Sequence, residues 1–178
     1  MDKKPLRKEI AARIAAMSAT QKSAESQKVA QKVASFGITG KKVFIYNALP
    51  DEVDTGKLIK TLAADNDVYL PVVDGEDMFL VKYGGKTVKG AFGISEPEGE
   101  RLTAEDVAPD ICVTPLRAFD GELNRLGRGK GYYDRFFAAC DCEKIALAFD
   151  CQKTDKINAD AHDVKMDAVV TASETYRK

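Results

Sequence analysis

From residue 125 to residue 134 the chain reads Arg-Leu-Gly-Arg-Gly-Lys-Gly-Tyr-Tyr-Asp. Glycine occupies every second position from 127 to 131, which lets the backbone come close to a ligand. Arg125, Arg128 and Lys130 bring cations to the same turn. This combination is typical of a loop that cradles a polyphosphate.

A helix is predicted directly after the glycine loop. Tyr132, Phe136, Phe137 and Cys140 recur at helical spacing. The N-terminal amides and the dipole of such a helix favour the same anion. Asp134 falls in its first turn, where a metal bound to that anion is within reach.

Short apolar runs on either side of this unit read as buried strands. One run precedes the loop at residues 111–114 and another follows the helix at 145–149. Strand, loop, helix and strand in this order predict an α/β protein with a mostly parallel central sheet. Further strands are predicted at residues 42–47, 68–73, 78–81 and 168–171.

The N-terminal part of the chain predicts two helices. Leu6, Ile10, Ile14 and Met17 form one apolar stripe, and residues 18–37 carry a capping box at the start and a glycine at the end. Leu58, Ile59 and Leu62 place another helix later in the chain, whereas residues 84–97 read as an irregular excursion. We therefore expect a single domain over residues 1–178, with two N-terminal helices followed by the α/β core.

Three segments that follow predicted strands are expected to border one cleft, because ligands of such sheets sit beyond the carboxyl ends of the strands. They are residues 47–55, 115–134 and 150–163. In the first segment Asp54 or Thr55 reads as a helix cap, which leaves Glu52 to meet a ligand. Asp134 with one late aspartate, Asp163 or Asp167, would suffice for Mg²⁺ beside a bound triphosphate.

Composition excludes several classes of protein. Apolar residues make up 44% of the 178 residues, charged residues 31%, and the net charge is only −1. Because there is no basic excess and no long apolar run, we expect a cytoplasmic protein with no nucleic-acid and no membrane partner. We also expect a monomer, although neither charge nor composition decides the oligomeric state. The cysteines are expected to be reduced and mostly buried, and the single histidine, His162, cannot build a histidine-rich metal site.

The glycine spacing also differs from two common nucleotide-binding motifs. No hydroxyl residue follows Gly129-Lys130, as a Walker motif requires, and the alternating glycines do not match G-x-G-x-x-G. In the first helix Lys3, Lys4 and Arg7 oppose the helix dipole, which indicates an anion nearby.

With these residues assembled, the chain resembles the 5-formyltetrahydrofolate cyclo-ligase family. The string from Asn124 to Asp134 is highly specific, and weaker matches agree with it in order and spacing. These weaker matches are residues 3–7, 49–55, 70–71, 93–97, 119–120 and 163–167.

The resemblance implies a three-layer α/β/α sandwich and an enzyme that uses ATP and Mg²⁺. Its reaction would convert 5-formyltetrahydrofolate, a reduced folate, to 5,10-methenyltetrahydrofolate with release of ADP and phosphate. Phosphoryl transfer to the formyl oxygen would activate that group for ring closure, with Arg128 and Lys130 as catalytic cations.

The resemblance also implies the remaining site residues. ATP would bind Lys3, Lys4, Pro5, Leu6, Arg7, Arg125, Leu126, Gly127, Arg128, Gly129, Lys130, Gly131, Tyr132 and Tyr133. The folate would bind Tyr46, Asn47, Glu52 and residues 127–132, and Mg²⁺ would bind Asp134 and Asp163.

Two departures from the family pattern lie just before the glycine loop. The family has Pro-Gly-x-Ala-Phe-Asp where this chain has Pro-Leu-Arg-Ala-Phe-Asp at residues 115–120, and it has glycine at the position of Leu123. Arg117 is expected to offer a further cation to the glutamate tail of the folate.

Two other readings remain open at this point. The chain could be a folate- or nucleotide-binding module that has lost the chemistry, as the two missing glycines suggest. An RNA-binding protein that uses the basic loop is disfavoured by the near-zero net charge and by the lack of interleaved aromatic residues.

Overall fold

A computed structural model describes residues 3–84, 86–89, 95–161 and 163–178. Among these residues seven strands form one sheet, in the order β11 (Thr175–Arg177), β10 (Ala168–Val170), β9 (Glu143–Leu147), β6 (Ile111–Pro115), β1 (Lys42–Ile45), β2 (Asp67–Asp74) and β3 (Asp77–Lys82). The strands from β10 to β2 run parallel. The two edge strands, β3 and β11, are antiparallel to their neighbours. The predicted mostly parallel sheet is confirmed.

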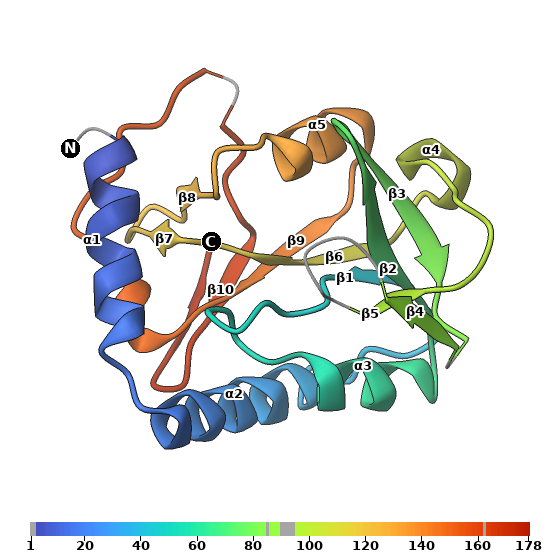
Figure 1. Cartoon of the computed structure of the whole chain (residues 1–178), viewed down its shortest axis with the longest axis horizontal. Coiled ribbons are helices and arrows are strands. Elements are labelled where there is room, and N and C mark those ends of the chain that lie inside the picture. The colour runs from blue at the N-terminus through green and yellow to red at the C-terminus, as the bar shows by residue number, and fades with distance from the viewer. Residues whose placement is uncertain (1–2, 85, 90–94, 162) are drawn as a thin grey trace.

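Helices cover both faces of the sheet. The helices α1 (Lys3–Ala15), α2 (Ala19–Ala34) and α3 (Gly56–Ala63) pack on one face, and α4 (Ala104–Val107) and α5 (Tyr132–Ala139) pack on the other (Figure 1). Side chains of the strands alternate between the two resulting cores: in β1, Val43 and Ile45 enter the first core and Phe44 enters the second. The three-layer α/β/α sandwich is therefore confirmed.

The two N-terminal helices form as their sequence predicts. Leu6, Ile10 and Ile14 are buried on α1, although Met17 lies beyond its end and is only partly buried. At the start of α2 the Ser18 hydroxyl accepts from the backbone N–H of Gln21 at 3.1 Å, and the Gln21 side chain accepts from the Ser18 N–H at 2.8 Å. The capping box thus satisfies two amides that a helix end leaves unpaired.

The predicted order of strand, loop, helix and strand is confirmed from β6 to β9, with one addition. Before the glycine loop, β7 (Ala118–Phe119) and β8 (Arg125–Leu126) form a small antiparallel hairpin. Leu123 lies in its turn with φ of 64°, a left-handed conformation that favours glycine. The chain thus keeps the backbone of a glycine turn at the position where its relatives are expected to have glycine, and accepts a strained leucine there.

The prediction of an irregular excursion over residues 84–97 is wrong in part. Two short strands, β4 (Thr87–Lys89) and β5 (Ser95–Pro97), pair there in antiparallel fashion, whereas Gly93 and Ile94 lie outside the described residues. Because β4 is exposed on all its residues, it has none of the apolar alternation by which a half-buried strand is recognised. The polar edge strand β11, the one-turn α4 and the 3₁₀ helix η2 (Asp150–Gln152) also escaped prediction.

No helix of the described residues has the length and apolar character needed to cross a bilayer. The four cysteines are free thiols; three of them, Cys112, Cys140 and Cys142, are buried as predicted.

Candidate active site

A cavity of about 460 Å³ lies at the carboxyl ends of β1 and β6. The segments predicted to border a cleft all contribute to its wall, together with α1 and the β2–β3 hairpin. The lining residues are Lys3, Arg7, Tyr46, Asn47, Leu49, Glu52, Pro71, Val73, Met78, Pro115, Leu116, residues 125–134 and Asp163. Segments far apart in the sequence thus meet at one site, as the topology of the sheet dictates.

The glycine loop connects β8 to α5 in a conformation that depends on its glycines. Gly129 and Gly131 have φ of 94° and 72°, which are left-handed values that side chains disfavour. A Cβ atom at Gly131 would also lie 2.8 Å from the guanidinium of Arg135. Glycine at these two positions therefore allows the turn that the loop makes along the cavity.

Cations of α1 reach this loop and the last segment of the wall. The Arg7 Nε donates to the Gly127 carbonyl at 2.8 Å. The Lys3 Nζ lies 2.5 Å from Asp163 Oδ2 and 2.6 Å from Asp160 Oδ2. Although its partial burial lowers the pKa of Lys3, the two carboxylates outweigh this effect and raise it. The N-terminal helix is thus tied to both flanks of the cavity.

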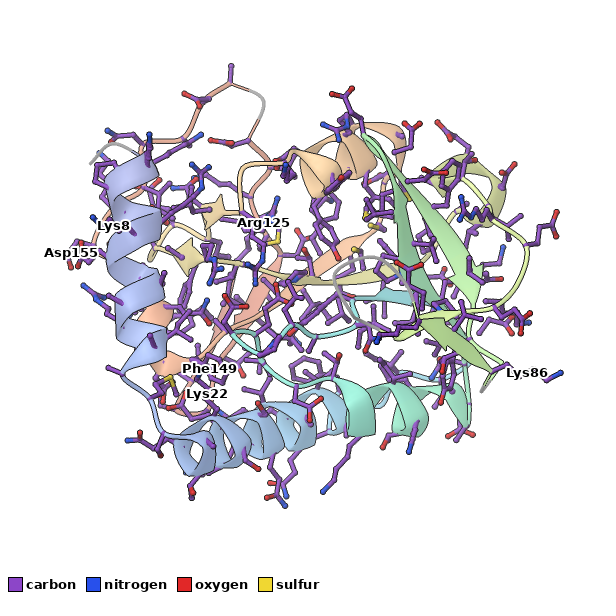
Figure 2. The ribbon with its side chains drawn as sticks, viewed as in Figure 1. Lys8, Lys22, Lys86, Arg125, Phe149 and Asp155 are labelled. Atoms are coloured by element: carbon purple, nitrogen blue, oxygen red, sulfur yellow. The ribbon has the colours of Figure 1, made fainter. Side chains whose placement is uncertain are left out.

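Arg125 is a buried cation at the base of the glycine loop. Its side chain is 4% exposed, and its Nη2 donates to Asp134 Oδ1 at 2.9 Å. The guanidinium also stacks on the Tyr133 ring, with 5.5 Å between its central carbon and the ring centroid. Within the described part of the chain its Nε has no hydrogen-bond partner. Figure 2 shows Arg125 inside the molecule, whereas Lys8 and Lys86 project from its surface.

Glu52 and Asp51 lie in the loop between β1 and α3, and both contact Arg128 of the glycine loop. Glu52 is 7% exposed in its side chain; its Oε1 accepts from Arg128 Nε at 2.9 Å and its Oε2 from the Leu49 N–H at 2.9 Å. Asp51 forms ion pairs with both Arg128 and Arg117. The residue at the N-cap of α3 is Thr55, one of the two predicted caps, but its side chain makes no capping hydrogen bond; Asp54, one residue earlier, accepts from the Gly56 N–H through Oδ1 at 2.9 Å.

The two predicted metal ligands both line the cavity but come from different walls. Asp134 pairs with Arg125, and Asp163 pairs with Lys3. Among the described residues no three acidic, cysteine or histidine side chains gather into a metal-binding group. Two carboxylates are still a suitable donor set for Mg²⁺, which takes most of its other oxygens from water and substrate phosphates.

An apolar wall completes the cavity, and sequence reasoning missed it. Pro71 and Val73 lie on one face of β2, and Met78 is the partner of Val73 in β3. The tip of this hairpin is tied to α5, because the Tyr132 hydroxyl donates to the Gly75 carbonyl at 2.6 Å. Alternation at residues 71 and 73 was a visible signal, but nothing in the sequence said which side of the strand faces the glycine loop.

Several predicted residues lie elsewhere. Lys4, Pro5 and Leu6 do not line the cavity, and Leu6 belongs to the core because it is on the sheet-facing side of α1. Arg117, expected to reach the substrate, is held by Asp51 behind the wall.

Of the two late aspartates, Asp167 is away from the cavity and pairs with Lys144 and Lys178. His162 lies outside the described residues.

Comparison with known proteins agrees with this site. The model of the 5-formyltetrahydrofolate cyclo-ligase family matches residues 1–172. The 5-formyltetrahydrofolate cyclo-ligase of Escherichia coli K12 is 35% identical over 147 residues, covering 75% of this chain and 79% of the relative. The mouse protein of the same name is 30% identical, covering 94% of this chain and 92% of the relative.

A solved structure is similar over almost the whole chain. The NMR structure of the Aquifex aeolicus 5,10-methenyltetrahydrofolate synthetase superposes with a TM-score of 0.85 at 34% identity, covering 99% of this chain and 93% of that one. Family model, relatives and fold agree, and the chain belongs to the 5-formyltetrahydrofolate cyclo-ligase family of enzymes.

Proposed function

We propose that this enzyme closes 5-formyltetrahydrofolate to 5,10-methenyltetrahydrofolate, with ATP converted to ADP and phosphate. Family membership supports the reaction. The observation that carries its assignment to the cavity is the convergence of five cations, three carboxylates and an apolar wall on one cavity of about 460 Å³. The cations are Lys3, Arg7, Arg125, Arg128 and Lys130, the carboxylates are Glu52, Asp134 and Asp163, and the apolar wall is Pro71, Val73 and Met78.

The two halves of the cavity suit the two substrates. The glycine loop and the cations would bind the triphosphate, because backbone amides, arginines and lysine neutralise phosphate oxygens. The apolar wall of the β2–β3 hairpin would cover the flat ring system of the folate, and the Glu52 carboxylate would accept from its N–H donors. Reacting groups of both substrates then meet beside Arg128 and Lys130.

The chemistry needs a better leaving group than the formyl oxygen. That oxygen attacks the γ-phosphorus, a new P–O bond forms, and the bond to the β-phosphate oxygen breaks to release ADP. The N10 amine then attacks the formyl carbon and loses its proton, and the C–O bond breaks to release phosphate. Arg128 and Lys130 would stabilise the negative charge on the transferred group, and positioning by the loop would supply much of the rate enhancement.

Asp134 and Asp163 would hold Mg²⁺ with the phosphate oxygens. The bound ion supplies additional neutralisation of phosphate charge. The protein's own part is to present these two carboxylates from α5 and from the segment before β10, where Arg125 and Lys3 orient them.

The test is an absorbance assay with purified protein, 5-formyltetrahydrofolate, ATP and Mg²⁺. We expect the methenyl chromophore to appear only when both ATP and Mg²⁺ are present, and to stop forming when a chelator removes the metal. Absence of the chromophore at ample enzyme would overturn the reaction. Calorimetric binding of folate or ATP without turnover would instead identify a binding module.

A further inference from the structure

Arg117 lies immediately behind the wall of the cavity. Its side chain is 13% exposed, and its Nη2 is 2.5 Å from Asp51 Oδ2. The backbone beneath it is fixed, because its N–H donates to the Leu126 carbonyl at 2.6 Å and its carbonyl accepts from Gln152 Nε2 at 3.1 Å. The guanidinium therefore extends from an anchored position, although neither Arg117 nor Asp51 lines the cavity.

Asp51 joins this anchored cation to a second arginine. Its Oδ2 accepts from Arg117, and its Oδ1 accepts from Arg128 Nη2. Arg128 in turn donates through Nε to Glu52 at 2.9 Å. Charges of alternating sign thus run from behind the wall to the cavity itself, and they connect the loop after β1 with the glycine loop.

Arg128 depends on such side-chain partners for its position. Its neighbours Gly127 and Gly129 give the backbone unusual freedom, and Gly129 has φ of 94°. An arginine side chain also loses rotamer entropy when it is held in one position, and its contacts must offset that loss. Since Asp51 is itself about one third exposed, a single ion pair there would hold Arg128 weakly. A second cation, Arg117, pairs with Asp51 and restricts the positions that its carboxylate can take, so that Asp51 holds Arg128 more firmly.

The charges around Asp51 agree with this arrangement. Partial burial raises the pKa of Asp51, but the hydrogen bonds and charges of Arg128 and Arg117 outweigh it and lower the pKa. The carboxylate is therefore ionised throughout the neutral range.

We propose that Arg117 is a positioning residue for the phosphoryl transfer: by holding Asp51, it keeps the Arg128 guanidinium beside Glu52 in the cavity wall. This inference rests on the proposed function, because it assigns Arg128 to the transferred phosphoryl group. Arg117 itself touches neither substrate and acts through Asp51.

The test compares Arg117→Met with Arg117→Lys and a matched control. Arg117→Met should lower kcat/KM for ATP on the order of tenfold to a hundredfold, the effect expected of a slight misplacement of a catalytic group. Arg117→Lys should recover most of the loss, because Lys keeps the charge that Asp51 requires. Arg101→Met is the control: Arg101 forms an exposed ion pair with Asp74, neither of the two lines the cavity, and the loss of the pair should leave the kinetics unchanged.

A double-mutant cycle separates positioning from a general structural defect. With concentrations corrected for folded protein, Arg117→Met should have no further effect in an Arg128→Met background, because Arg117 acts only through Arg128. Wild-type kinetics in Arg117→Met, or the same fold loss in both backgrounds, would overturn the proposal.

An NMR measurement distinguishes failure of this proposal from failure of the proposed function. The Nε–H resonance of Arg128 reports its hydrogen bond to Glu52 whether or not the protein turns over folate. We expect it to shift in Arg117→Met and to return in Arg117→Lys. An unchanged resonance would refute positioning, whereas a shifted resonance in a protein that makes no methenyl product would refute the reaction alone.

Discussion

The two ends of the parallel sheet are both hollowed, yet their polar groups are used differently. At the amino ends of β1 and β2 a cavity of about 530 Å³ is lined by residues 40–42, 64–67 and Asp110. There Asp110 Oδ2 accepts from the backbone N–H of Lys42 at 2.8 Å, and Asn66 Oδ1 accepts from that of Lys41 at 3.0 Å. At the carboxyl ends the charged groups are instead paired with one another, as in Lys3–Asp163 and Arg128–Glu52.

This difference shows why volume alone does not mark a site. A carboxylate that caps a strand cannot leave without unpairing a backbone amide, whereas two oppositely charged side chains can separate and each take a ligand group instead. The carboxyl end therefore holds several ion pairs that a ligand can separate. At the amino end Asp110 is already bonded to the backbone, and the exposed pair of Asp67 with Lys82 is the exception there.

The largest expected effect comes from replacing an exposed lysine at the carboxyl end by methionine, and the same exchange at the amino end serves as its control. Lys130→Met should lower kcat about 100-fold to 1,000-fold, since Lys130 lines the cavity and is the cation that we propose for the transferred phosphoryl group. Lys41→Met, in the wall of the other cavity, should leave kcat unchanged. Steady-state kinetics measure kcat of both variants, and thermal melts check that both are folded. Equal losses of kcat in the two variants would contradict the assignment of the active site to the carboxyl end.

Replacing one aspartate at each end of the sheet should lower the free energy of unfolding by different amounts. Asp134→Ala leaves the buried guanidinium of Arg125 without its carboxylate, and should cost about 3 kcal/mol of unfolding free energy. Asp110→Ala exposes one amide at the surface, where water replaces the carboxylate, and should cost about 1 kcal/mol. Urea unfolding measures both. A larger cost at Asp110 would show that the strand caps, and not the ion pairs, carry more of the stability.

Left-handed backbone occurs at two non-glycine residues of the described chain, where substitution by glycine should give effects of opposite sign. Ala108 has φ of 45° and is exposed, so that Ala108→Gly should stabilise the protein by about 1 kcal/mol. Leu123 has φ of 64° but is 4% exposed, so that Leu123→Gly should destabilise by about 2 kcal/mol, because lost burial exceeds the relief of strain. Chemical denaturation checks the signs; stabilisation by both glycines would mean that the Leu123 side chain contributes little to the core.

The smallest expected effect is a loss of the stability contributed by Asp51 at acidic pH. Because the pKa of Asp51 is lowered in the folded protein, the stability that Asp51 contributes is present above its unfolded pKa of about 4 and is lost as the pH falls through the folded value. The difference in unfolding free energy between the wild type and Asp51→Asn should be constant from about pH 5 to pH 8 and shrink below about pH 4. A difference that already declines near pH 6 would contradict the ion pairs with Arg117 and Arg128.

Local patterns predicted the elements that bury apolar residues and the loop that carries glycine and charge. Burial on one face of an element places apolar residues at regular intervals in the sequence. This spacing made it possible to predict the helix that carries Leu6, Ile10 and Ile14, and the apolar run made it possible to predict β6. The exposed β4 and the polar β11 were missed, because a strand that buries little leaves no such period.

The site was predicted as a set of segments but not as a set of contacts. The rule for carboxyl ends of parallel strands brought Glu52, Asp134 and Asp163 to one place. It could not indicate that Arg117 turns to Asp51, since that pairing depends on side-chain directions in two loops that are far apart in the sequence. For the same reason the apolar wall around Met78 was not foreseen.

The contacts of α1 with segments late in the chain determine when α1 can take its final place during folding. Lys3 closes on Asp160 and Asp163, and Arg7 closes on Gly127, so the first helix leaves the ribosome long before its partners exist. The central β1 likewise waits for β6, which makes the contacts non-local and the folding slow by comparison with a helical bundle. A nascent chain interrupted before residue 160 would keep the contact between Arg7 and Gly127 but would lack Asp160, Asp163 and the strands β10 and β11, so that one wall of the cavity would be incomplete.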